Sequence, residues 1–359
     1  MLGVPFDLDR LEVRGTPSPL LEDVAGDTTS AGGQFDVSRN GTFVYLGGKS
    51  SAAAWPLVWL DSTGKTEPLL ASPGAYYTPR LSPDGKRLAV SVSTHAIGVY
   101  DSQRDTMTPL TFKPQFTLSP VWTPDGKHIV FSATAGVIGI LQWSRSDGAG
   151  EAQQLLQSKT DLRPYSFSPD GKRLAFAQSS PETGFDLWTL PLDLSDPEHP
   201  KAGKPELFLR TVADEYEPAF SPDGRWIAYR STSTGVAEIY VQPFPGSGGK
   251  WLISNGGGKH PVWSRNGREL FYQAPDNRIM VATYTAKGDS FSADKPRPWA
   301  QTQILEPNAL NWNLDLAPDG KRFVVAPRLE ATGGQKGSVH VTVLLNFFDE
   351  LRRRVPASK

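Results

Sequence analysis

The sequence of 359 residues contains no cysteine and no long hydrophobic run. The missing cysteine excludes disulfide bonds, thiolate nucleophiles and cysteine-ligated metals. No segment approaches the roughly 20 consecutive apolar residues that a membrane-spanning helix needs. Residues 1–7 also lack the basic and apolar segments of a signal peptide. We therefore expect neither a membrane span nor a signal peptide in this chain.

Net charge is nearly absent as well, at −1, with acidic and basic residues interspersed along the chain. Such a balance offers no electrostatic surface for nucleic acid or anionic membranes, so neither is an expected partner. Glycine (34) and proline (31) are abundant instead, and their even distribution indicates many tight turns between short strands. The composition predicts an all-β protein, which we expect to be a monomer.

One turn sequence recurs seven times, with proline or arginine second, aspartate or asparagine third and glycine last. The copies are Ser38–Gly41, Ser82–Gly85, Thr123–Gly126, Ser168–Gly171, Ser221–Gly224, Ser264–Gly267 and Ala317–Gly320. Proline presets the backbone angle φ of the first central residue, and glycine takes the left-handed conformation that returns the chain. Their spacing of roughly 41 to 53 residues is typical of propeller blades.

Each turn joins two predicted strands, and a third and a shorter fourth strand follow before the next turn. Because such a sheet cannot bury both faces alone, we predict that the units stack into a closed ring. The seventh unit lacks a fourth strand after residues 339–344, whereas residues 16–22 form an orphan strand before the first unit. The prediction is an all-β, seven-bladed β-propeller of four-stranded blades, whose last blade is closed by this N-terminal strand. It is a single domain, residues 1–359, with a closing region at 1–24, blades at 25–345 and a short helix with a tail at 346–359.

The recurring Ser-Pro-Asp-Gly-Lys-Arg-Leu-Ala pattern resembles that of TolB-like β-propellers. Over nearly its whole length the chain is also similar to the C-terminal propeller of bacterial serine/threonine protein kinases, above all at 4–13, 261–272 and 345–356. This resemblance implies a bacterial protein that is extracytoplasmic if it belongs to a receptor-type kinase. The unit motif is shared with TolB and with the propellers of prolyl-oligopeptidase-type peptidases, so it specifies the fold strongly and the function weakly.

Catalytic motifs are missing: the sequence has no kinase catalytic segment, no Gly-x-Ser-x-Gly and no His-Glu-x-x-His. Candidate site residues remain at the start of the first strand in each unit, which we expect to line the central channel. Three positions before the large apolar residue, consecutive units carry Glu217, His260 and Asn313. These groups could hold a divalent metal, and the imidazole favours Zn²⁺ or Mn²⁺ over Ca²⁺. Asp315 or Glu215 could then accept a proton from a metal-bound water.

Polar residues are equally expected in a water-filled channel that binds nothing, so a structural role for these residues is the alternative. The function predicted first is a sensor-type module that binds a small molecule or a protein at the channel mouth, without kinase or peptidase activity. A metal-dependent hydrolase of esters, lactones or phosphotriesters is the second. A scaffold for other envelope proteins, based on fold analogy alone, is the third.

Overall fold

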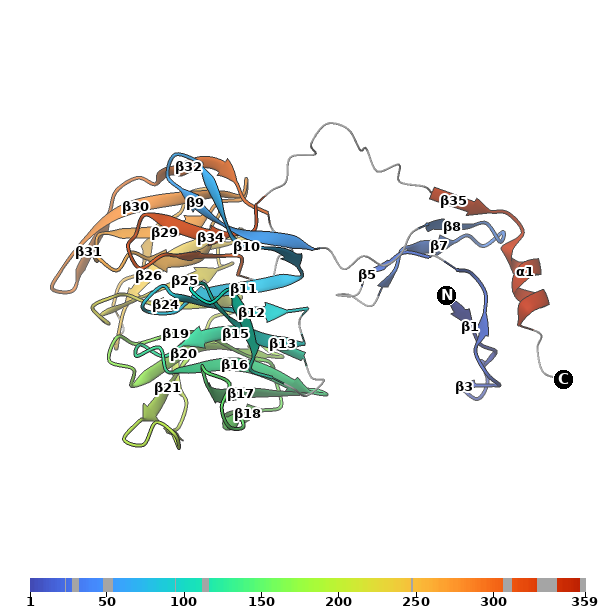
Figure 1. Ribbon diagram of the computed structural model, residues 1–359, viewed down its shortest axis with the longest axis horizontal. Helices are drawn as coiled ribbons and strands as arrows, with labels where there is room; N and C mark the ends of the chain where they lie inside the picture. The colour runs from blue at the N-terminus through green and yellow to red at the C-terminus, as the bar shows by residue number, and fades with distance from the viewer. Residues whose placement is uncertain are drawn as a thin grey trace. The chain divides into compact units, whose positions relative to one another are not determined.

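The computed structural model describes residues 1–22, 24–27, 32–47, 54–93, 95–111, 116–246, 248–305, 312–327 and 341–355. The chain divides into two compact units, one of Met1–Ala54 with Leu329–Lys359 and the other of Trp55–Arg328. Both units are built mainly from short strands (Figure 1). The all-β prediction is therefore confirmed.

Five sheets of the larger unit each consist of strands that follow one another in the sequence. The first holds β11 (Tyr76–Leu81), β12 (Arg87–Val92), β13 (Ala96–Asp101) and β14 (Thr106–Pro109). The second holds β15 (Phe116–Trp122), β16 (His128–Ala135), β17 (Ile138–Arg145) and β18 (Gln153–Ser158). The third holds β19 (Leu162–Phe167), β20 (Arg173–Ser180), β21 (Gly184–Asp193), β22 (Lys201–Ala202) and β23 (Glu206–Leu209). The fourth holds β24 (Glu215–Phe220), β25 (Trp226–Ser231), β26 (Glu238–Pro243) and β27 (Trp251–Leu252). The fifth holds β28 (Lys259–Trp263), β29 (Glu269–Gln273), β30 (Arg278–Lys287), β31 (Ser290–Ala293) and β32 (Arg297–Gln303).

The sixth sheet joins strands from the two ends of this unit in the order β10-β9-β34-β33. Its members are β9 (Trp55–Asp61), β10 (Thr66–Gly74), β33 (Leu314–Leu316) and β34 (Arg322–Val325). Leu60 of β9 lies opposite Phe323 of β34, and both side chains are fully buried. Burial of this apolar pair stabilises the union of two segments that are far apart in the sequence.

The first strands of the six sheets form a closed ring, because β33 contacts both β28 and β11. Within the described residues of Trp55–Arg328 the propeller therefore closes with six blades. This corrects the predicted number of seven. The third and fourth strands of the last blade are β9 and β10, which the repeat pattern had assigned to the first unit. A segment from the N-terminal side thus closes the ring, but it is β9 with β10 and not residues 16–22.

The smaller unit contains the remaining copy of the turn, Ser38–Gly41, between β7 (Phe35–Val37) and β8 (Phe43–Leu46). β8 also pairs with β35 (Val341–Leu344), while residues 339 and 340 lie outside the described part. The expected closing strand, residues 16–22, does not join the last blade: its β4 (Ser18–Pro19) pairs with β1 (Leu2–Gly3). The other strands here are β2 (Phe6–Asp7), β3 (Glu12–Val13), β5 (Gly26–Asp27) and β6 (Gly32–Gly33).

The C-terminal helix α1 (Phe347–Arg354) completes the core of the smaller unit. The rings of Phe43 and Phe347 stack at 4.4 Å between centroids, and Leu20 is buried beside them. Arg354 Nη1 donates a hydrogen bond of 2.9 Å to Leu20 O, which ties the helix to the N-terminal segment. Among the described residues, no helix is long and apolar enough to cross a membrane.

Candidate functional site

Glu217 and His260 lie in a bulge of the first strand, and the equivalent positions of two other blades do so as well. The register of β11, β15, β24 and β28 shifts where these positions lie. The left-handed residues at this point are Thr78 (φ 49°), Ser119 (φ 57°), Glu217 (φ 59°) and His260 (φ 58°). A bulge inserts an extra residue and redirects the side chain there, so equivalent positions of neighbouring blades are brought toward one another. The sequence repeat located these positions, but the bulge itself was not predicted.

Glu217 and His260 are in direct contact, as their positions in consecutive blades suggested. His260 Nδ1 lies 2.9 Å from Glu217 Oε1, and His260 N donates a hydrogen bond of 2.6 Å to Glu217 Oε2. Arg230 Nη1 lies 3.6 Å from the same Oε1 atom. Both carboxylate oxygens are therefore engaged with groups of the protein.

The pKa of Glu217 is set by opposing effects. Burial by itself would raise it, but the His260 side chain, its hydrogen bonds and the Arg230 charge together lower it to about 2. Glu217 therefore stays ionised throughout the neutral range. A buried carboxylate with these partners fits a structural role: it pairs with Arg230 of its own blade and accepts hydrogen bonds from His260 of the next blade.

No hydrogen bond connects the Asn313 side chain to this pair within the described part of the chain. Its Nδ2 atom donates a hydrogen bond of 2.7 Å to Leu305 O. Its Oδ1 atom and the Nε2 atom of His260 are buried without a hydrogen-bond partner among the described residues. No group of three or more His, Asp or Glu side chains there is arranged to hold a metal ion. The structure thus brings Glu217 and His260 together, and the metal site of Glu217, His260 and Asn313 stays a prediction.

The two predicted proton acceptors lie in different surroundings. Asp315 is half-buried, and its carboxylate accepts hydrogen bonds from Leu81 N (2.7 Å) and Leu316 N (3.0 Å). Glu215 accepts one of 2.8 Å from Thr211 Oγ1. Burial raises the pKa of both carboxyl groups. A catalytic role for either residue stays a prediction.

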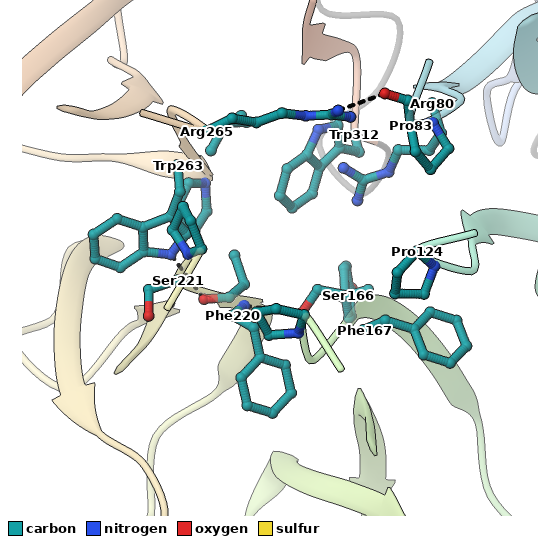
Figure 2. A pocket seen from close by; sticks show the side chains of 16 residues that line it. Arg80, Pro83, Pro124, Ser166, Phe167, Phe220, Ser221, Trp263, Arg265 and Trp312 are labelled. Atoms are coloured by element: carbon teal, nitrogen blue, oxygen red, sulfur yellow. Dashed lines mark hydrogen bonds between the residues drawn. The ribbon is translucent and has the colours of Figure 1, made fainter. Parts of the chain in front are cut away.

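A cavity of the larger unit lies at the end of the ring that carries the repeated turns, and all six blades contribute to it. Its volume is about 440 Å³ (Figure 2). Four turn prolines are part of its rim: Pro83, Pro124, Pro169 and Pro222. Aromatic walls and two cations complete the lining: Tyr165, Phe167, Phe220, Trp263, Trp312, Arg80 and Arg265. We call this cavity the turn-side pocket.

The turn-side pocket is distinct from the predicted site. Neither Glu217 nor His260 lines it, and Asp315 lines only an adjoining, partly overlapping cavity of about 280 Å³. The sequence did carry a signal for Arg80. This residue stands directly before the large apolar residue of its strand, where the other blades have Val121, Ser166, Ala219, Val262 and Asp315. An arginine at a channel-facing repeat position was a candidate that our sequence reasoning missed.

Comparison with known proteins shows the fold. No protein-family model matches the sequence, and no curated protein matches it. Among solved structures, a TolB protein from Agrobacterium tumefaciens is similar at a TM-score of 0.55 and 17% identity, with 76% of this chain and 98% of that one covered. A chain of a nidogen/laminin complex is similar at 0.50 and 12% identity, over 64% and 89% of the two chains. A puromycin-hydrolyzing peptidase from Mycobacterium tuberculosis is similar at 0.50 and 14% identity, over 89% of this chain and 56% of that one.

The chain therefore spans about half the length of the peptidase that it resembles. Identities this low carry the fold and leave function open. The protein is a TolB-like β-propeller in its architecture. The similarity to kinase propellers stays a prediction.

Proposed function

We propose that this protein is a binding propeller without kinase or peptidase activity, and that its ligand occupies the turn-side pocket. The pocket itself is the observation that supports this proposal. A concave site of several hundred Å³, mostly apolar with a few polar groups, is the usual form of a small-ligand site. Contributions from all six blades make it a feature of the closed ring.

The serines of the pocket support binding over covalent catalysis. Ser166 Oγ donates to Pro218 O (2.9 Å) and accepts from Phe220 N (3.0 Å). Ser221 Oγ donates to the Asp223 carboxylate of its own turn. No histidine is among the described residues that line the cavity, so neither hydroxyl has there the base that an activated serine requires. A serine-directed covalent inhibitor should label no specific residue, and specific labelling of one serine would contradict this part of the proposal.

Filling the pocket tests the binding proposal. Pro222 lines the pocket at the second position of a turn, where most residue types are accepted, so Pro222→Trp should occupy space without breaking the turn. Pro318→Trp changes the equivalent turn position of the last blade, which does not line the pocket, and serves as the matched control. Binding is measured by calorimetry with a panel of small acids, bases, neutral aromatic compounds and short peptides.

We expect at least one compound of the panel to bind saturably to the unmodified protein and to Pro222→Trp at least tenfold more weakly. Pro318→Trp should bind as the unmodified protein does. Thermal unfolding of both variants checks that the ring remains intact. The proposal fails if no compound binds saturably, or if filling the pocket leaves every affinity unchanged.

Metal-dependent hydrolysis is our alternative proposal, favoured only by the unpartnered atoms His260 Nε2 and Asn313 Oδ1. It requires Glu217 to exchange its contacts with His260 and Arg230 for a cation. Zinc titration by calorimetry should then show stoichiometric binding that is lost in Glu217→Ala and His260→Ala. Esterase or phosphotriesterase turnover should vanish with chelator and return with Zn²⁺ or Mn²⁺. Turnover that is unaffected by chelator and by both substitutions would exclude Glu217 and His260 as a catalytic metal site.

A further inference from the structure

Arg80 holds a charged group at the turn-side pocket without a hydrogen-bonding partner in the described part of the chain. Its guanidinium carbon lies 3.8 Å from the ring centroid of Trp312, which fixes the side chain by a cation–π contact. In Figure 2 the guanidinium group points toward the open centre of the pocket. A guanidinium carries five N–H donors, and none of those of Arg80 donates to another described residue.

The surroundings of Arg80 leave its charge poorly compensated. Burial lowers the pKa of Arg80, and the charges of Asp315, Tyr165 and Glu217 offset this effect only in part. Asp315 itself directs its two oxygens to the backbone N–H groups of Leu81 and Leu316. A desolvated cation whose N–H donors are unpaired raises the free energy of the protein until a hydrogen-bond acceptor binds to it. The pocket therefore favours an anion over a neutral or cationic group.

Two further polar groups border the same space. Tyr165 is buried in the pocket wall, and its hydroxyl has no hydrogen-bond partner among the described residues. Arg265 reaches across the rim and donates to Pro83 O through Nη1, which leaves its other donors available (Figure 2). The rest of the lining is mostly apolar and includes Pro124, Phe167 and Phe220, and the rings of the two phenylalanines point away from the open centre (Figure 2).

The charge of Asp315 limits which anion fits. Asp315 lies in the cavity that adjoins Arg80, and it would repel a doubly charged group such as phosphate more than a single negative charge. A carboxylate carries one charge and matches the two parallel N–H groups of a guanidinium. The apolar lining of the pocket then accommodates an apolar group of the same molecule.

We infer that the turn-side pocket binds a carboxylate that carries an aromatic or bulky apolar group, with Arg80 as the carboxylate-binding residue. The inference rests on the proposed binding function and specifies the chemistry of its ligand. Two sources share this chemistry: a free aromatic carboxylic acid, and the C-terminal residue of a peptide.

The first experiment uses the unmodified protein, so it does not depend on the folding of a variant. Calorimetry measures binding of two acids, phenylpropionate and the peptide Gly-Gly-Gly-Phe with a free carboxylate, and of the primary amide of each. We expect the free peptide to bind at least tenfold more tightly than its amide if the peptide is the source, and phenylpropionate to bind more tightly than its amide if the free acid is. Equal binding of acids and amides, or no binding of any acid, overturns the inference.

The second experiment removes the guanidinium. Arg80→Gln should weaken binding of the preferred acid at least tenfold, and Arg80→Lys should retain part of it. Arg322→Gln is the matched control, because Arg322 stacks on Trp59 at 4.0 Å in the same manner but lies outside the pocket. Undiminished affinity in a folded Arg80→Gln variant, or equal competition by inorganic phosphate, contradicts the inference.

The two proposals fail in different ways. Suppose that neutral or basic compounds bind, that Pro222→Trp abolishes this binding, and that no acid binds. The binding function then stands and the carboxylate specificity is wrong. If no compound of the panel binds, the binding function fails as well.

Discussion

Leu81 and Asp315 are 234 residues apart in the sequence and are joined by a hydrogen bond of 2.7 Å from Leu81 N to Asp315 Oδ2. The bond links the first strand of the last blade to that of the first blade, at the point where the ring closes. Ser166 stands at the equivalent position of the third blade and accepts a hydrogen bond from Phe220 N of the fourth blade. At this repeat position, a side chain of one blade thus accepts a hydrogen bond from the backbone of the next blade. Where the ring closes, the acceptor is the carboxylate of Asp315.

Replacement of Asp315 should destabilise the closed ring. Asp315→Ala leaves the buried N–H of Leu81 unsatisfied and removes a counter-charge of Arg80, so we expect the free energy of unfolding to fall by about 2–3 kcal/mol. Asp315→Asn retains an acceptor and should cost less. Urea denaturation followed by tryptophan fluorescence measures both. Unchanged stability of Asp315→Ala would show that the closing link contributes little.

The stability of the larger unit should depend on the ionisation of Glu217. Its pKa is lowered from 4.5 to about 2 in the folded protein, so the unfolded chain binds the proton first as the pH falls. The stabilisation is therefore complete above about pH 4.5 and is lost progressively toward pH 2, with a total on the order of 3 kcal/mol. Unfolding free energies measured across this interval should vary less in Glu217→Gln than in the unmodified protein. The exposed Glu182→Gln serves as the control, and equal pH dependence in all three proteins would contradict the ion-pair assignment.

Ser119, at the bulge position of the second blade, should accept glycine and should be destabilised by valine. Ser119 has φ 57°, a conformation that costs an ordinary residue roughly 1–2 kcal/mol and glycine almost nothing. We expect Ser119→Gly to be neutral or stabilising by up to about 1 kcal/mol, and Ser119→Val to destabilise by about 1–2 kcal/mol. Thr134→Gly, in the regular strand β16, should destabilise the protein instead. A higher urea midpoint for Ser119→Val than for the unmodified protein would exclude the left-handed conformation at residue 119.

Engineered cysteines can establish the pairing in the smaller unit, because the natural chain has none. Val44 of β8 lies opposite Val343 of β35, and paired residues of antiparallel strands are close enough for a disulfide. We expect Val44→Cys with Val343→Cys to cross-link on mild oxidation, as detected by mass spectrometry. The offset pair Val44→Cys with Val341→Cys should cross-link far less. Absence of the first cross-link would favour the original assignment of residues 339–344 to the last blade.

Much of the architecture was predictable from local chemistry. In six of the seven turns found by sequence, Ser82–Gly85 to Ala317–Gly320, the last glycine has positive φ and the turn joins two strands of a blade. The contact between Glu217 and His260 followed from their equivalent positions in consecutive repeats. The position of Arg80 on Trp312 was not predictable, because it depends on closure with six blades, which brings β11 next to β33.

The sequence by itself determined the strands, the turns and the all-β propeller class, since these depend on hydrophobic alternation and on residues that accept particular backbone angles. Only the tertiary structure decided which third strand completes which sheet. Strands β9 and β35 both follow a first and second strand in the repeat, yet β9 pairs with β34 and β35 pairs with β8. Repeated units present nearly equivalent edges, so the local sequence cannot choose among partners. The choice depends on burial over the whole ring, which also closes the blades around the turn-side pocket.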